Sequence, residues 1–243
     1  DKETVMSKKP TTHVALILDR SSSMSSIREE AIGAFNDQLR VIREESEDGT
    51  PNLVTLTTFA TTVDDFQFFD EAPKQIPTLT LDRYQPGGST ALLDAIMKTV
   101  DAFRKLPDAD DPDTSFLVAV ITDGEENSSQ EYSLRNDGPK RVGETIKELE
   151  ATQRWTFTYL CANVDPTKIQ RTLNISAGNT MSFTADRSGT VAASTFHSAS
   201  TSNYLKARKM GLTSTPTFYS GTKPKPPSQD LTQRKPKSKK PKK

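Results

Sequence analysis

The chain has 243 residues and carries 32 basic and 32 acidic side chains, so its formal net charge at pH 7 is zero. This length is sufficient to bury one core and falls within the range of single α/β domains. No apolar run approaches the length of about 20 residues that crosses a bilayer, and no secretory signal pattern is present, which argues against a membrane-spanning protein.

Apolar runs alternate along the chain with stretches of helical periodicity. Strands are expected, in chain order, at 13–18, 53–59, 63–69, 116–122, 155–161 and 180–183. Helices are expected at 26–45, 90–105, 139–152, 166–173 and 189–210, the last one despite many Ser and Thr residues, which lower helix propensity. The alternation predicts an α/β fold: a doubly wound, mostly parallel sheet of about six strands, with helices on both faces and one antiparallel edge strand from a hairpin at 53–69.

Charge is distributed unevenly along the chain. Residues 222–243 hold nine Lys or Arg, one acidic residue and five prolines, which leaves 23 basic and 31 acidic side chains, a net charge of −8, for residues 1–221. We therefore expect three parts: a flexible N-terminal arm at 1–12, one domain at 13–211, and a disordered, basic Pro/Lys-rich tail at 212–243.

Cys161 is the only cysteine, which excludes an intrachain disulfide. In a domain of this size, this usage favours a reducing compartment, and we expect a cytoplasmic location. An extracellular location stays open. Cys161 itself is expected to be a small buried apolar residue rather than a reactive thiol.

Polar residues follow the first apolar strand directly. The run Asp19-Arg20-Ser21-Ser22-Ser23 comes after Val14–Leu18, which is typical of a strand buried on both faces of a parallel sheet. Residues in this position lie at the carboxyl end of a strand, where open α/β sheets bind ligands. Asp19, Ser21 and Ser23 offer oxygen atoms at alternate positions, which suit a hard cation such as Mg²⁺. By itself the run also fits a serine-rich loop that caps the next helix.

Two later segments strengthen the interpretation as a metal site. Pro86-Gly87-Gly88-Ser89-Thr90 is a glycine turn that brings a threonine to the start of a helix, and Thr122-Asp123-Gly124 ends a second buried strand. Together the three segments resemble the metal-ion-dependent adhesion site of the von Willebrand factor A family, in motif order and in spacing. The resemblance implies the doubly wound fold of that family and five metal ligands: Asp19, Ser21, Ser23, Thr90 and Asp123.

The resemblance also implies what the metal would do. With only two carboxylates among its ligands, Mg²⁺ or Mn²⁺ would keep residual positive charge, and an Asp or Glu of a protein partner would complete its coordination. Five further residues are expected at the rim or just behind the ligands: Gly88, Ser89, Gly124, Glu125 and Glu126. Arg20 and Met24 lie either at the rim or under the loop, and the sequence does not decide between these positions.

Catalysis is not expected. The chain has no nucleophile elbow, zinc-protease helix, phosphate loop or dinucleotide fingerprint. His13 and His197 are interpreted as structural or surface residues, and the acidic run at 108–113 as a solvated loop. The expected function is metal-dependent protein–protein interaction.

Two alternatives remain. One is an accessory subunit of an ATPase- or chelatase-type machine, and the other is an assembly protein that contacts nucleic acid through its tail. The tail is also open to several interpretations: a solubilising end, a targeting signal, a segment folded onto the acidic body, or a weak, nonspecific binder of nucleic acid or anionic surfaces. The basic residues that would bind such polyanions are Lys235, Lys237, Lys239, Lys240, Lys242 and Lys243.

Overall fold

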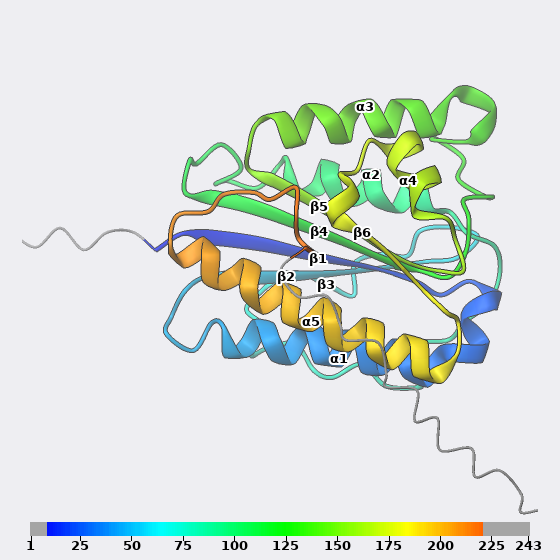
Figure 1. Ribbon diagram of the computed structural model, residues 1–243, viewed down its shortest axis with the longest axis horizontal. Helices are drawn as coiled ribbons and strands as arrows, with labels where there is room; N and C mark the ends of the chain where they lie inside the picture. Colours follow the sequence, from blue (N-terminus) through cyan, green and yellow to red (C-terminus); the bar gives the residue numbers. More distant parts are fainter. Residues whose placement is uncertain (1–8, 221–243) are drawn as a thin grey trace, which may run out of the picture.

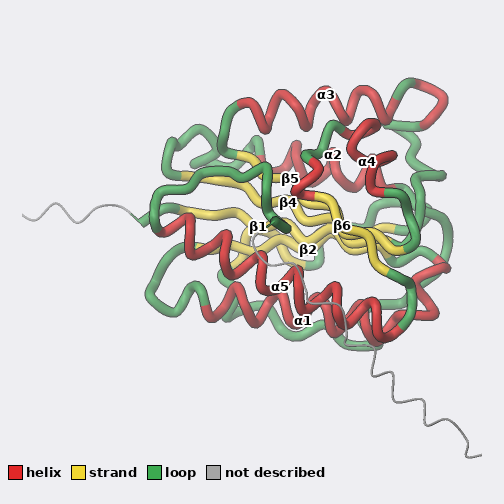
Figure 2. Tube along the Cα trace, in the orientation of Figure 1, coloured by secondary structure: helices red, strands yellow, loops and turns green. Residues whose placement is uncertain are grey.

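The first strand, β1 (Thr11–Asp19), is buried on both of its faces. Val14, Leu16 and Leu18 contact one hydrophobic core, and Ala15 and Ile17 contact a second core on the opposite side. Since successive side chains of a strand point to opposite faces, this strand requires cover on both sides. The computed structural model, which describes residues 9–220, provides that cover with helices above and below one central sheet (Figures 1 and 2).

The sheet has six strands in the order β3-β2-β1-β4-β5-β6. Neighbouring strands pair in parallel except at one edge, where β3 is antiparallel to β2. The predicted fold class, a mostly parallel sheet with one antiparallel edge strand, is therefore confirmed. The remaining strands are β2 (Asn52–Phe59), β3 (Phe68–Glu71), β4 (Thr114–Thr122), β5 (Trp155–Ala162) and β6 (Thr180–Phe183).

Helices divide between the two faces of the sheet. In Figure 1, α1 and α5 lie on one side of the sheet, and α2, α3 and α4 on the other. The bounds of the helices are α1 (Arg28–Glu44), α2 (Leu92–Phe103), α3 (Gly138–Ala151), α4 (Pro166–Leu173) and α5 (Arg187–Lys209), and three short 3-10 helices are η1 (Ser22–Ile27), η2 (Leu134–Asn136) and η3 (Ala177–Asn179).

Two predicted elements differ from the observed ones near the end of β1. The helix expected at 26–45 is preceded by η1 and becomes α-helical only at Arg28, because its serine-rich start favours local hydrogen bonds over a regular helix. The strand expected at 63–69 is reduced to a single bridge between Val63 and Phe59, and β3 begins only at Phe68. The backbone between them turns at Asp64, whose amide donates to the carbonyl of Thr58.

Helix α5 forms despite its Ser and Thr content because those side chains find partners on α1. Gln38 of α1 donates to the hydroxyl of Ser198, at 3.0 Å, and accepts a hydrogen bond from Thr201, at 2.7 Å. Ser194 donates in the same way to Asp37, at 3.2 Å. Tertiary contact thus overrides a weak intrinsic preference for helix.

The described chain continues past residue 211, where the expected domain ends. Residues 212–220, here called the C-terminal strap, return across the sheet, and Phe218 and Tyr219 are only 6% and 7% exposed within the core. The amide of Tyr219 donates to the carbonyl of Gly178, and its hydroxyl pairs with Nδ1 of His197 at 2.8 Å. The strap therefore belongs to the folded domain.

A buried arginine fastens the end of α5 near the strap. Arg208 is 1% exposed, and its guanidinium donates to the carbonyls of Thr11, Asp113 and Leu212. These bonds link the last turn of α5 to the starts of β1 and β4. Residues 1–8 of the expected arm and the six lysines of the basic tail lie outside the described residues.

Replacing Phe218 by Ala should lower the free energy of unfolding by about 3 kcal/mol, since a buried ring that contacts Tyr204 and Tyr219 would be lost. Chemical denaturation of the full chain measures this change. Val191→Ala, at a side chain that is 53% exposed, is the control and should change stability by less than about 0.5 kcal/mol. Equal stabilities of the two variants would contradict the placement of the strap in the core.

Candidate metal centre

The two aspartates of the predicted site lie at the same edge of the sheet. Asp19 is the last residue of β1, and Asp123 follows Thr122, the last residue of β4. The strands are parallel neighbours, and their register pairs Leu18 with Ile121, one residue before each of these ends. Both aspartates therefore reach the carboxyl edge of the sheet, which faces right in Figure 1.

A chain of hydrogen bonds connects the hydroxyls of the first loop to the second aspartate. Ser21 Oγ lies 3.1 Å from Ser23 Oγ, and Ser23 Oγ donates to Asp123 Oδ1 at 2.6 Å. Ser21 is buried and Ser23 is exposed. Three of the five predicted ligands are thus brought into direct contact with one another.

Thr90 enters the same space from a third loop. The position that a Cβ atom would take on Gly124 lies 3.4 Å from Thr90 Oγ1, 3.8 Å from Asp19 Oδ2 and 3.9 Å from Ser23 Oγ. Oxygen atoms from two loops therefore lie within 4 Å of one point beside the backbone of Gly124, which belongs to the third loop.

The Asp19 carboxylate is fully buried and has no cationic partner among the described residues. It accepts hydrogen bonds from the amide of Ser21, at 2.6 Å, and from the hydroxyl of Thr122, at 2.5 Å. Burial raises the pKa of Asp19 despite these bonds, and the negative charge of Asp123 adds to the shift. Burial also raises the pKa of Asp123. Two carboxyl groups thus share a site that disfavours their negative charge.

Thr122 contacts the candidate site, although sequence analysis did not assign it a role there. Its hydroxyl holds Asp19 Oδ2, and it also accepts a hydrogen bond from the amide of Gly124 at 3.0 Å. One side chain therefore orients the first aspartate and the turn that follows the second. The position of Thr122 at the end of its strand could have revealed this contact, because extending the register of β1 and β4 by one residue places Thr122 opposite Asp19.

Arg20 lies at the rim of the site and clamps the first loop to the segment after β2. Its Nε and Nη2 donate to the two carboxylate oxygens of Asp64 at 2.5 and 2.6 Å. Its backbone amide donates to Phe59, and its carbonyl accepts from Gly87. Met24, in contrast, is 1% exposed and packs beneath the loop. The two positions that the sequence left open are thereby distinguished.

The glycine turn supports the first loop through its backbone. The carbonyl of Gly88 accepts from the amide of Ser22 at 3.0 Å, and the amide of Ser89 donates to the hydroxyl of Thr61 at 3.0 Å. Gly88 has a φ of +81°, and a Cβ atom there would overlap the Thr61 hydroxyl. Glycine is required at this position on both grounds.

Glu126, which was expected at the rim of the site, caps the start of α2. Its carboxylate accepts from the amides of Leu93, Ser128 and Ser129 at 2.7 to 2.9 Å. Negative charge at a helix N-terminus is favourable, because it satisfies free amides and interacts with the helix dipole. Glu125, also expected at the rim, pairs with Lys168 of α4 at 2.6 Å.

The five predicted ligands contain two carboxylates and three hydroxyls, a donor set suited to Mg²⁺ or Mn²⁺. Residues 9–220 contain no cluster of three or more His, Cys, Asp or Glu side chains that could hold a metal.

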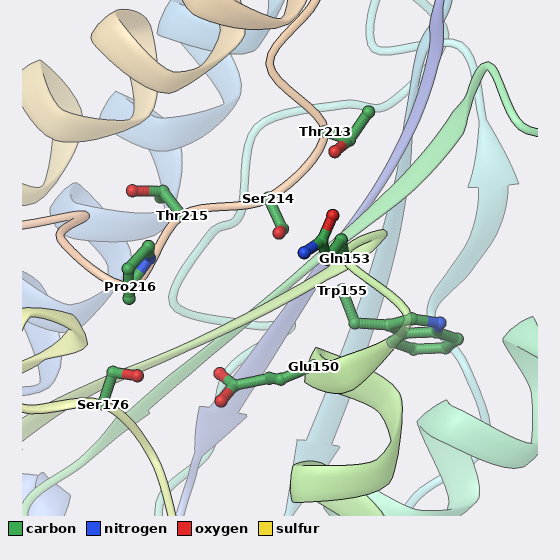
Figure 3. A pocket seen from close by; sticks show the side chains of 8 residues that line it. All are labelled: Glu150, Gln153, Trp155, Ser176, Thr213, Ser214, Thr215 and Pro216. Carbon is green, nitrogen blue, oxygen red and sulfur yellow. The ribbon is translucent and has the colours of Figure 1, made fainter.

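A polar hollow of about 370 Å³ opens at the opposite end of the sheet, near the amino end of β5. Figure 3 shows Glu150 reaching into it from the end of α3, with Ser176 on one side and Gln153 and Ser214 on the other. Burial raises the pKa of Glu150 to about 7. None of the predicted site residues lines this hollow, so it is separate from the candidate metal centre.

His13 lies near the starts of β1 and β4, also far from the metal loops. Its Nδ1 contacts Asp70 at 2.5 Å and its Nε2 contacts Asp108 at 3.1 Å. Burial lowers the pKa of His13, but the two carboxylates outweigh burial and leave the pKa raised. His13 thus connects the edge strand β3 to the loop before β4.

Among the described residues, no helix combines the length and the apolar character needed to span a membrane.

Comparisons with known proteins support the fold and nothing finer. No protein-family model matches the chain, and no curated protein matches it. Among solved structures, it is similar to the PilB minor pilin from Streptococcus sanguinis, with a TM-score of 0.55 and 12% identity over 85% of this chain and 63% of the pilin. The D319A mutant of that pilin gives the same TM-score of 0.55 at 12% identity, over 90% of this chain and 65% of the mutant.

A von Willebrand factor type A protein from Catenulispora acidiphila is a more distant structural match. Its TM-score is 0.48 at 12% identity, over 83% of this chain and 42% of that protein. The chain thus spans less than two thirds of the length of each of these three structures.

Replacing Thr122 by Val should lower the free energy of unfolding in EDTA at pH 7 by about 1 to 3 kcal/mol, because a buried oxygen of Asp19 would lose its donor. Urea denaturation measures the loss. Ser115→Ala, in the same strand, removes a buried hydroxyl without a hydrogen-bond partner among the described residues, and it should cost little. Equal losses in the two variants would argue against a special role for Thr122.

Replacing Glu150 by Gln should stabilise the protein at pH 8 but not at pH 4. The folded pKa of Glu150 is raised to about 7 from 4.5, so its stabilising contribution is present below pH 4.5 and is lost as pH rises through 7. Allowing for its partial exposure, the gain at pH 8 is on the order of 1 kcal/mol. Thermal denaturation at both pH values measures it, and Glu148→Gln, at an exposed position on the same helix, is the matched control.

Proposed function

We propose that this protein is a metal-dependent protein-interaction module. The observation that carries the proposal is the convergence of Asp19, Ser23 and Thr90 around one point beside Gly124, with Ser21 and Asp123 in hydrogen-bond contact with Ser23. These are the five residues expected from the resemblance to the von Willebrand factor A family. The fold supports the same proposal, because the point lies at the carboxyl edge of a mostly parallel sheet.

The electrostatics of the site favour occupation by a cation. Asp19 is a fully buried carboxylate without a positive partner among the described residues, and such a group is costly unless it is neutralised. Mg²⁺ or Mn²⁺ would be held by Asp19 and Asp123 together with the hydroxyls of Ser21, Ser23 and Thr90. When bound, the ion supplies positive charge to which an outside carboxylate can add.

The other residues of the site position these ligands. Thr122 orients Asp19, and Arg20 fixes the first loop against Asp64. Glu126 and Asn127 hold the segment around Thr90, since the side chain of Asn127 accepts from the amide of Thr90 at 2.9 Å. Every group assigned here binds or positions a ligand, and none is assigned a proton-transfer or nucleophilic role. We therefore propose binding, not catalysis, with an Asp or Glu of a protein partner as the outside ligand.

Asp19→Ala should weaken Mn²⁺ binding by more than about 10-fold, and Thr90→Ala should weaken it several-fold, because each removes an oxygen ligand. Calorimetric titration of the metal-stripped protein measures the affinity, and thermal denaturation in EDTA verifies folding. The control is Asp82→Ala, which removes an exposed carboxylate with no hydrogen bond or ion pair to any of residues 9–220. Unchanged affinity in Asp19→Ala would overturn the proposed function.

The same proteins test the role of the partner's carboxylate. Wild type used as bait with Mg²⁺ should retain a protein that neither Asp19→Ala nor wild type in EDTA retains. Equal recovery under all conditions would mean that the metal does not bridge to a partner.

A further inference from the structure

An apolar hollow of about 150 Å³ opens between the loop after Asp123 and the helices α2, α3 and α4. Its lining includes Leu92, Leu93, Leu134, Tyr159, Ile169 and Leu173. A cavity of about this size with such a lining accommodates one benzene-sized group. The hollow therefore has the dimensions and chemistry to hold a single leucine, isoleucine, methionine or phenylalanine side chain.

The hollow adjoins the candidate metal centre along two segments of the chain. Leu92 follows Thr90 by two residues, and Glu125 follows Asp123 by two residues. Two consecutive virtual bonds of 3.8 Å place each pair of Cα atoms at most about 7.6 Å apart. Because an extended peptide advances about 3.3 Å per residue, one partner segment of two to four residues reaches from the metal centre to the hollow.

The rim of the hollow is exposed and held by weak contacts. Leu134 is 60% exposed, an unusual position for a large apolar side chain. Glu125 and Lys168 pair across the rim at 2.6 Å, and both side chains are 58% exposed. An exposed ion pair contributes little to stability, so it can rearrange for an incoming group at low cost. The floor is firm by contrast, because Leu92, Leu93 and Tyr159 are each at most 2% exposed.

We propose that this hollow receives an apolar side chain of the same partner segment whose carboxylate binds at the metal centre. The recognised sequence then contains an Asp or Glu and, two to four residues away, a Leu, Ile, Met or Phe. The charge of the metal selects the Asp or Glu of the partner, and the hollow selects the nearby apolar side chain. Specificity for the partner then depends on these two contacts together. This inference rests on the proposed function and specifies the chemistry of the partner.

Selection of peptides tests the pairing of the two contacts. Random 12-residue peptides displayed on phage are selected on the immobilised full chain with Mn²⁺ and eluted with EDTA. We expect the enriched peptides to share an acidic residue and a large apolar residue at a fixed offset. A synthetic peptide of this kind should bind wild type about 10- to 100-fold more tightly than its counterpart with Ser at the apolar position.

Variants of the hollow provide the second half of the test. Leu134→Asp alters the rim, and Thr172→Phe fills the space from an exposed position on α4. Both should lose the preference for the apolar peptide while they retain Mn²⁺ affinity and the wild-type melting temperature. The matched control is Leu81→Asp, at a side chain that is 47% exposed and outside the hollow, and it should behave as wild type.

The outcomes separate this inference from the proposed function. Equal affinity for the apolar and the serine peptide, or no recovered peptide despite Mn²⁺ binding, would overturn the inference alone. If the apolar peptides bind equally well in EDTA, the inference that one segment occupies both the metal centre and the hollow is wrong. Failure of wild type to bind Mn²⁺ would overturn the proposed function and, with it, the inference.

Discussion

The parallel pairing of β1 with β4 is the constraint on which the rest of the structure depends. Its register carries both strands to the same edge of the sheet and ends them at Asp19 and Thr122, one residue before Asp123. Two acidic side chains, Asp19 and Asp123, thereby share one end of the sheet although they lie 104 residues apart in the chain. A shift of one residue would move every apolar side chain of β1 to the opposite core and Asp19 to the opposite face, so the fit of each side chain to its own core also positions the carboxylates.

The candidate site stabilises the fold less than the sheet that supports it does. A buried carboxylate without a cation destabilises the metal-free fold, and the surrounding loops compensate with hydrogen bonds. Arg20 and Asp64 join two of these loops, and the backbone contact between Ser22 and Gly88 joins a third. The segment after Asp123 is held on α2 by Glu126 and by Asp94, which accepts from the amides of Gln130 and Tyr132. A disfavoured charge held in a well-supported frame is typical of functional sites.

The carboxyl ends and the amino ends of the parallel strands are surrounded by different kinds of contact. At the carboxyl edge, loops bring polar oxygens together and leave an apolar hollow beside them. At the opposite edge, charged side chains join elements of the fold: His13 connects Asp70 with Asp108, and Arg208 fastens the end of α5 to the starts of two strands. The proposed binding site and these stabilising contacts thus lie at opposite ends of the same strands, which allows loops at one end to vary without loss of the core.

The amino-acid sequence by itself predicted most of the strands and helices and the mostly parallel sheet, because burial on two faces produces continuous apolar runs. The five candidate ligands were named from the resemblance to a known family, and Asp19 and Asp123 could be placed together because residues directly after parallel strands lie at the same end of the sheet. Only the tertiary structure decided that Thr122 holds Asp19, that Glu126 caps α2, that Arg20 pairs with Asp64 and that the chain from 212 to 220 returns to the core. These contacts join residues far apart in the chain, and no local periodicity encodes which distant partner a polar side chain will meet. The hollow beside the candidate metal centre was likewise not predictable from sequence, because it forms where three helices and a loop meet and no single segment determines its shape.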